Sequence, residues 1–187
     1  PGRHLSGRSD IVGADGQRVD EQPEDPLELL LVAPGDRRGH AEVVLARVAR
    51  PHVAFLGRVP GTKQYSDMAR HPENEAPSGA IAFRPEASLI YVNADAVLET
   101  VLSRLDGRSE IRLVVCDLSA SPYVDLAGSR MLHELSSELV ARGVALRIIA
   151  ARGQVRDLLR RDGIDDKVGG LDRTVTLESL LRSNALE

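Results

Sequence analysis

The sequence predicts an α/β domain in which a mixed β-sheet of about five to six strands is flanked by about four helices. Short apolar runs of β-prone residues come first, between Val53 and Val92, and from there to Leu181 helical and apolar segments alternate. Such alternation is typical of parallel strands joined by crossover helices. The run Leu113–Cys116 is apolar throughout rather than alternating, as expected of a strand covered on both faces.

The first part of the domain is predicted to hold three strands before the first long helix. Val53–Leu56 predicts a strand, and Thr62–Ser78, which is charged and contains prolines, predicts a long exposed connection. Gly79–Phe83 and Ser88–Val92 are too close together for a crossover helix, which predicts that they pair as a hairpin. Asn93 is then expected to cap a helix.

The remaining elements follow from helical spacing and from helix stops. Between Asn93 and Gly107, apolar residues recur at spacings of three and four, which places them on one helix face. A second helix is expected from about Leu126 to Arg142. Four further elements are expected: a strand at Val144–Ile149, a short helix at Gln154–Arg161, an edge strand at Asp166–Val168, and a last helix bearing Leu177, Leu180 and Leu181 that Thr176 caps.

Three parts of the chain differ in composition. Residues 1–40 contain several prolines and glycines and few large apolar residues, which predicts a disordered segment or one foreign to the domain. Residues 41–50 predict a short linker helix that ends at Pro51, and residues 51–187 the folded domain. Because the first residue is Pro1 rather than Met, we expect the chain to be a piece of a longer protein.

Composition also restricts the classes of function. The chain carries 24 Lys and Arg against 28 Asp and Glu, interspersed along its length, which argues against nucleic acid as a partner. The single cysteine, Cys116, lies in an apolar run and is expected to be a core residue in a reducing, cytosolic compartment. The longest apolar runs are far shorter than the roughly 18 residues of a membrane helix, so no membrane span is expected.

No arrangement of residues predicts catalysis or metal binding. The histidines have no metal-ligand spacing with one another or with Cys116, and no Ser-His-Asp order stands in a nucleophile-elbow context. Gly57–Lys63 superficially resembles a phosphate-binding loop, but it lacks the required spacing and does not open a helix. We therefore expect that the chain is not an enzyme.

The strongest candidate for a functional site is the stretch from Asp117 to Gly128, which joins a buried strand to the next helix. In α/β folds, ligands gather at the carboxyl ends of strands, where helix N–H groups attract anions. Asp125 is placed to cap the helix, and Gly128 to let it pack closely against the sheet. An architectural role and a recognition role are equally compatible with this pattern. The residues assigned to this regulatory and interaction site are Asp117, Ser119, Ser121, Tyr123, Asp125, Leu126, Ala127, Gly128 and Ser129.

Two blocks of sequence resemble a known family. The motif Asp117-Leu-Ser, followed by Val124-Asp-Leu-Ala-Gly128, is similar to the signature of STAS domains, which occur in anti-sigma factor antagonists and in the cytoplasmic tails of SulP anion transporters. The block from Arg50 to Thr62, with Tyr65-Ser-Asp67, Gly79–Arg84 and Tyr91–Ala94, resembles the beginning of the STAS domain in SulP permeases, where a first strand follows the last membrane helix. The resemblance covers roughly residues 50 to 182.

The resemblance implies a regulatory and interaction domain of a sulfate-type anion permease, with the permease's own membrane domain and other cytosolic proteins as partners. Soluble antagonists carry a phosphorylated hydroxyl at the position of Ala127, so its absence favours the transporter branch. The alternative is a soluble partner-switching antagonist phosphorylated elsewhere, at Ser119, Ser121 or Ser129. Some STAS domains bind nucleotides, which implies a guanine or adenine nucleotide site at Asp125, Gly128 and Ser129.

Overall fold

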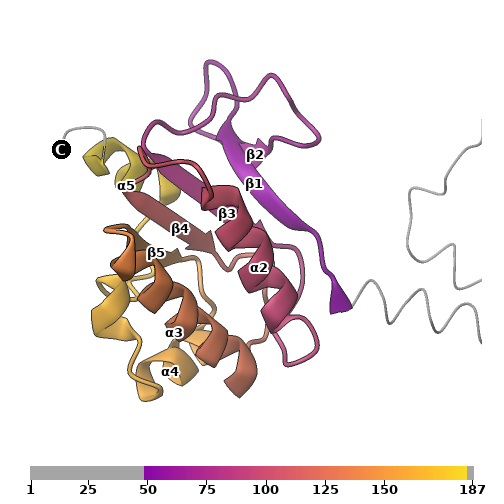
Figure 1. Cartoon of the computed structure of the whole chain (residues 1–187), viewed down its shortest axis with the longest axis vertical. Helices are drawn as coiled ribbons and strands as arrows, with labels where there is room; N and C mark the ends of the chain where they lie inside the picture. Colours follow the sequence, from indigo (N-terminus) through magenta and orange to yellow (C-terminus); the bar gives the residue numbers. More distant parts are fainter. Residues whose placement is uncertain (1–48, 185–187) are drawn as a thin grey trace, which may run out of the picture. The chain divides into compact units, whose positions relative to one another are not determined.

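The fold is that of a five-stranded mixed sheet with helices on both faces (Figure 1). A computed structural model describes residues 49–184, so the segment predicted at 1–40, most of the linker helix predicted at 41–50, and residues 185–187 lie outside the described residues. Within the described part, the strand order is β2-β1-β3-β4-β5. The predicted α/β class, with its mixed sheet, is confirmed.

The antiparallel part of the sheet is built from its first three strands. β1 (Val53–Arg58) lies between β2 (Tyr65–Asp67) and β3 (Ala80–Pro85) and is antiparallel to both. The prediction that residues 62–78 form only an exposed connection was wrong for β2. The three residues of β2 pair with the second half of β1, and Arg58 forms a further bridge with Glu75.

The parallel part contains the predicted crossovers. α2 (Ala94–Leu105) leads from β3 to β4 (Leu113–Asp117), and α3 (Leu126–Ala141) leads from β4 to β5 (Ala145–Ile149). β4 is parallel to both β3 and β5. Because parallel strands align their carboxyl ends, the segments that follow β3 and β4 lie at one end of the sheet.

The hairpin predicted for Gly79–Phe83 and Ser88–Val92 was wrong, because the second segment is not a strand of the sheet. Leu89 is fully buried and forms an isolated parallel bridge with Val124. Its N–H donates to the carbonyl of Tyr123, and its carbonyl accepts from the N–H of Asp125. The backbone groups that a hairpin would have used are therefore paired with the loop before α3.

The C-terminal part contains α4 (Gly153–Arg161), a 3-10 helix η2 (Asp165–Val168) and α5 (Leu177–Asn184). The edge strand predicted at Asp166–Val168 was wrong. The N–H groups of Lys167 and Val168 both donate to the carbonyl of Ile164, and Gly169, at φ 69°, ends the turn. A local turn therefore uses the backbone groups that pairing with β5 would require.

The predicted helix caps had different outcomes. Thr176 is a cap as predicted, because its hydroxyl oxygen accepts from the N–H of Ser179, whose own hydroxyl oxygen accepts from the N–H of Thr176. Asn93 precedes α2 but forms no side-chain cap to it. Its side chain turns back instead, where it accepts from the N–H of Ile90 and donates to the carbonyl of Ser88.

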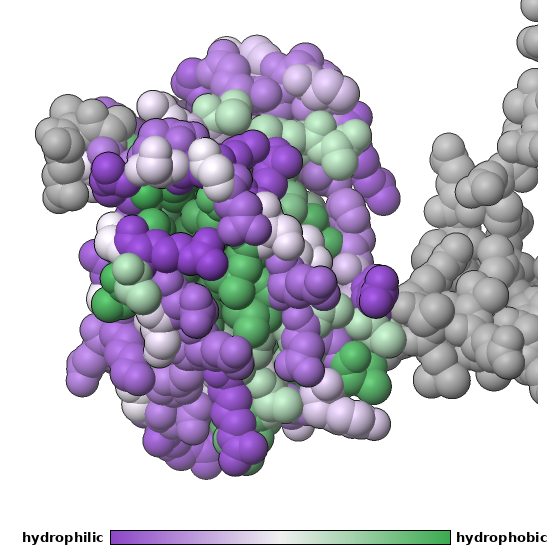
Figure 2. All heavy atoms as spheres, in the orientation of Figure 1, coloured by the Kyte–Doolittle hydropathy of each residue, from purple (hydrophilic) through white to green (hydrophobic). Residues whose placement is uncertain are grey.

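The core has two layers, one on each face of the sheet. α2, α3 and α4 pack on one face around Phe83, Val114 and Cys116, and α5 packs on the other face around Leu56 and Val115. α2 and α3 lie side by side in front of the sheet in Figure 1. Figure 2 shows a band of apolar residues through the middle of that side, with hydrophilic residues on both sides and smaller apolar spots elsewhere.

Candidate functional site

The candidate site lies at the end of the sheet where the chain enters the domain. Val53, the first residue of β1, pairs with Pro85, the last residue of β3, and the N–H of Glu86 donates to the carbonyl of His52. The loop after Asp117 leaves β4 at the same end, because β3 and β4 are parallel. The chain entry, the segment before α2 and the loop before α3 therefore share one end of the domain.

Asp125 holds two of these segments together. One carboxylate oxygen accepts from the N–H of Gly128 at 2.8 Å, which confirms the predicted cap of α3. The other oxygen accepts from the N–H of Tyr91 at 2.9 Å, in the segment before α2. Because both oxygens are used within the domain, Asp125 positions the site rather than offering a free carboxylate to a partner.

Gly128 allows the two segments to approach each other closely. A Cβ atom added there would lie 2.5 Å from the carbonyl oxygen of Leu89, a contact that no side chain could accommodate without movement. The close packing predicted for Gly128 is therefore present. Its partner is the backbone of Leu89 in the segment before α2, rather than a strand of the sheet.

The three serines predicted as phosphate acceptors have different environments. Ser121 is fully buried, and its hydroxyl donates to the carbonyl of Ala87 at 2.8 Å. Ser129 is also fully buried, and its hydroxyl donates to Asp162. Ser119 alone among the three is exposed, in a turn where its N–H donates to Asp117. A kinase would reach Ser119 without unfolding the loop, but not the other two.

Large apolar side chains remain exposed around the start of α3. We call Tyr91, Val92, Tyr123 and Leu126 the apolar rim; their exposed fractions are 76%, 36%, 58% and 50%. The bridge between Leu89 and Val124 holds the two segments of the rim side by side. Of the large apolar side chains described as exposed, only Val140, toward the other end of α3, lies outside this rim.

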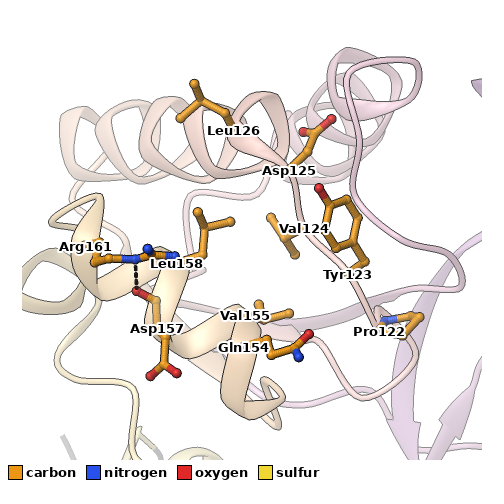
Figure 3. Close-up of a pocket in the computed structure, with 10 residues that line it drawn as sticks. All are labelled: Pro122, Tyr123, Val124, Asp125, Leu126, Gln154, Val155, Asp157, Leu158 and Arg161. Atoms are coloured by element: carbon orange, nitrogen blue, oxygen red, sulfur yellow. Dashed lines mark hydrogen bonds between the residues drawn. The ribbon is translucent and has the colours of Figure 1, made fainter.

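A pocket of about 430 Å³ adjoins the rim, between the loop before α3 and the helix α4 (Figure 3). Tyr123, Val124, Val155 and Leu158 point toward its interior in Figure 3, whereas the side chain of Leu126 points away from it. Arg161 lies at its margin, where Nε donates to the backbone carbonyl of Asp157. The pocket therefore combines an apolar interior with a polar margin, as small binding pockets commonly do.

Sequence reasoning placed Tyr123 and Leu126 at the site but missed Tyr91, Val92, Val155 and Leu158. The first two were assigned to a strand, and the last two to a short helix without a role in the site. Their position directly before Asn93 could have predicted the exposure of Tyr91 and Val92. Apolar residues in the turn before a helix are not covered by a neighbouring strand. For Val155 and Leu158 no local signal exists, since α4 reaches the pocket only through the tertiary fold.

Groups with nucleophilic or titratable side chains near the site do not form a catalytic arrangement. The Ser129 hydroxyl donates to Asp162 rather than to His133, whose Nε2 lies 3.0 Å from the backbone carbonyl of Asp162. Cys116 is fully buried in the core, and burial raises the pKa of its thiol. Among the described residues there is no cluster of side chains suited to a metal ion.

The family of the chain follows from a sequence match that covers the Asp117–Gly128 block and the later part of the second predicted block, from Gly79 to Ala94. The family model described as the STAS domain matches residues 71–178, which is more than half of the chain. The chain belongs to the STAS domain family. The match includes β3, β4, α3 and the whole of the Asp117–Gly128 loop.

Relatives of this STAS domain are named as sulfate transporters. Sulfate transporter 2.1 of Arabidopsis thaliana is 30% identical over 142 residues, which are 70% of this chain and 21% of the transporter. A probable sulfate transporter of Mycobacterium tuberculosis is 29% identical over 127 residues, which are 67% of this chain and 23% of the transporter. The chain thus spans about a fifth of the length of these relatives. The predicted resemblance to the STAS domains of sulfate transporters is confirmed.

Solved structures support the same fold. The murine anion transporter solute carrier 26 family member A9, in its inward-facing state, matches with a TM-score of 0.65 at 17% identity. The match covers 79% of this chain and 24% of the transporter chain. Within residues 49–184, no helix of this STAS domain has the length and apolarity needed to cross a membrane.

Proposed function

We propose that this STAS domain is the regulatory and interaction domain of a SulP-type anion transporter, at the cytoplasmic face of the membrane. It docks against the transporter's membrane domain through the apolar rim. Anion transport itself takes place in the membrane domain, and the STAS domain changes it by binding or releasing that domain. Sequence similarity to sulfate transporters supports the assignment to this class.

The observation that carries the proposal is that the apolar rim lies where the chain enters the domain. In a transporter the segment before β1 leads to the membrane domain, so the end of the sheet that contains His52 and Val53 faces that domain. Tyr91, Val92, Tyr123 and Leu126 are exposed at this end. Exposed apolar groups of this kind, next to a pocket, are typical of protein–protein interfaces.

The test uses the complete transporter in cells that lack other sulfate uptake. Tyr123→Ser combined with Leu126→Ser removes apolar surface from the rim but leaves the backbone hydrogen bonds of the loop intact. We expect sulfate uptake to change about fivefold, the effect of losing about 1 kcal/mol at an interface. Uptake is compared at equal amounts of transporter in the membrane.

The matched control is Val140→Ser, because Val140 is as exposed as the rim but lies toward the opposite end of α3. This variant is expected to transport sulfate at the rate of the unmodified protein. Equal rates for all three proteins would contradict docking through the rim. Equal losses in the rim variant and the control would instead indicate a general effect of apolar surface.

Binding of a guanine or adenine nucleotide at Asp125, Gly128 and Ser129 stays a prediction. The Asp125 carboxylate would repel phosphate groups at the start of α3, and the Ser129 hydroxyl is buried. Titration of the chain with fluorescently labelled GTP and ATP tests it. If neither nucleotide binds, or if binding persists unchanged when Asp125 is replaced by Asn, the site at the start of α3 is wrong.

The alternative function is that of a soluble antagonist that binds an anti-sigma kinase. Because Ser119 is exposed, it is the favoured phosphorylation site among the three serines. Mass spectrometry after incubation with such a kinase separates the two functions. A phosphate on Ser119 would support partner switching, and a Ser119→Ala variant should then remain unmodified. Absence of phosphate on the chain would leave the transporter domain as the supported function.

A further inference from the structure

A second hollow lies beside α4 and contains several arginines. Its volume is about 530 Å³, and Arg156 and Arg160 of α4 line it together with Arg173 from the loop before α5. Arg156 and Arg160 are four residues apart and therefore lie on the same face of the helix. Neither residue lines the pocket next to the apolar rim. We call this second hollow the arginine hollow.

Much of the hydrogen-bonding capacity of these arginines is free. Nη1 of Arg156 donates to the carbonyl of Ala151, and Nη2 of Arg160 donates to the carbonyl of Leu171. A guanidinium carries five N–H donors, so each of the two retains several. Arg156 and Arg173 form no ion pair with another residue in the described range 49–184.

Two carboxylates also line the arginine hollow, but both are used by neighbouring groups. Asp165 accepts from the N–H of Leu171 at 2.8 Å and lies 3.7 Å from Nε of Arg160. Asp172 accepts from both the N–H and the hydroxyl of Thr174. These bonds from Thr174, with the nearby charges of Arg173 and Arg160, lower the pKa of Asp172. Three positive charges thus face two negative charges that are already hydrogen-bonded.

We propose that the arginine hollow binds a phosphate group, either free or carried on a lipid headgroup. Guanidinium groups recognise phosphate through paired N–H donors, and Arg156, Arg160 and Arg173 reach the hollow from two different segments. Gly170 contributes no side chain to the lining, and no atom beyond its chain neighbours lies within 4 Å of the position that a Cβ atom would take there. The hollow is larger than inorganic phosphate, so a substituent on the phosphate can be accommodated.

This site is independent of the docking proposed above, because it uses the other side of α4. It also differs from the start of α3, where Asp125 places a negative charge against any anion. An exposed anion site of this kind weakens with salt, because ions screen surface charges over about 10 Å at 0.1 M ionic strength. Binding is therefore measured at low ionic strength and again with added sodium chloride.

The first experiment titrates the full chain with inorganic phosphate and follows binding by calorimetry. Arg156→Gln combined with Arg173→Gln should weaken binding at least about tenfold, since hydrogen bonds to charged groups are the strong ones. The matched control, Arg130→Gln with Arg182→Gln, removes the same charge from exposed arginines elsewhere and should leave binding within about twofold. Equal weakening in both double variants, or no binding by the unmodified chain, would overturn the proposal.

A variant that is expected to bind phosphate more tightly distinguishes loss of the site from loss of folding. Asp172→Asn retains an acceptor for Thr174 and removes one negative charge from the hollow, so phosphate should bind a few times more tightly. Binding that is unchanged or weaker in this variant would contradict a site in the arginine hollow. Thermal unfolding of each variant shows that the fold is retained.

A second arm of the experiment distinguishes the two sources of the phosphate group. Co-sedimentation is measured with phosphatidylcholine vesicles that contain or lack phosphatidic acid. Sedimentation that requires phosphatidic acid and is lost in the Arg156 and Arg173 double variant assigns a lipid headgroup. Binding of inorganic phosphate without sedimentation assigns a free phosphate. If the double variant sediments as well as the unmodified chain, the arginine hollow is not the lipid site.

Discussion

Two regions of the domain, the start of α3 and the β2 edge of the sheet, use their polar side chains in opposite ways. At the start of α3, polar side chains bind mainly backbone groups: Asp125 accepts from Gly128 and Tyr91, and Ser121 donates to Ala87, whereas Ser129 donates to the side chain of Asp162. At the β2 edge, polar side chains pair mainly with one another. These pairs are His52 with Asp67, Asn74 with Ser66, Tyr65 with Glu178, and Arg58 with Glu75.

The difference determines which surface each region presents. At the start of α3, side chains hydrogen-bond to backbone groups and so hold the loop in place. The surface of the loop needs no polar side chains for this purpose, and apolar side chains such as Tyr123 and Leu126 are exposed there. Where side chains pair with one another, the outer surface consists of charged and polar groups, which bind water well. A docking surface is therefore expected at the start of α3 and not at the β2 edge.

The largest effect is expected from Gly128→Val, which tests how closely α3 approaches the segment before α2. The new Cβ would lie 2.5 Å from the carbonyl oxygen of Leu89, so we expect a loss of about 3 kcal/mol in the free energy of unfolding. Urea denaturation measures it. Gly153→Ala is the control, because the nearest atom to its Cβ, Nη2 of Arg156, is 4.0 Å away. Similar stabilities for the two variants would show that α3 is free to move.

A smaller effect is expected from Asp125→Ala, which removes the hydrogen bonds that the Asp125 carboxylate accepts from the N–H groups of Tyr91 and Gly128. Loss of such a helix cap typically costs about 1–2 kcal/mol. Asp125→Asn keeps an acceptor for the cap and should recover much of this loss. Urea unfolding of the two variants measures the difference. Equal losses in both would mean that the negative charge of Asp125 matters more than its geometry.

Tyr65→Phe tests the β2 edge, where the phenol donates to Glu178 of α5 at 2.7 Å. Removing this bond should cost about 1 kcal/mol near neutral pH. Burial, together with the hydrogen bond and charge of Glu178, raises the pKa of Tyr65 to about 12 from 10.0. The unfolded chain therefore loses this proton first, and the stability that Tyr65 contributes falls as pH rises from 10.0 to about 12.

The measurement compares urea unfolding of the two proteins at about pH 7 and about pH 11. The unmodified chain should lose more stability than Tyr65→Phe over this interval, because the variant has no phenol to titrate. Parallel losses in the two proteins would assign the pH dependence to other groups. They would also remove Tyr65 from the network that we contrast with the start of α3.

Features that depend on neighbours in the sequence were predicted well. Asp125 caps α3 and Thr176 caps α5 because a cap requires only the residues of the first helical turn. The continuous apolar run at Leu113–Cys116 correctly indicated a strand covered on both faces. The site loop was located for the same reason, since the end of a buried strand and a helix cap are both local signals.

Features that depend on distant partners were missed. Ser88–Val92 has the composition of a strand, but its backbone is paired with residues 123–125. Asp166–Val168 likewise has a β-prone residue, yet it forms a turn that Gly169 ends. The arginine hollow combines α4 with a loop that approaches it only in the tertiary fold, so no spacing along the sequence could indicate it.

The smallest effect on stability is expected from Tyr91→Ser, although Tyr91 lies next to the start of α3, where Gly128→Val is expected to have the largest effect. Its backbone N–H still donates to Asp125 in the variant, and its ring is 76% exposed. We therefore expect the free energy of unfolding to change by less than about 0.5 kcal/mol in urea denaturation. A loss of about 2 kcal/mol would mean that the ring packs against the domain. A small loss would instead show that the backbone at the start of α3 is held firmly while the ring of Tyr91 remains available to a partner.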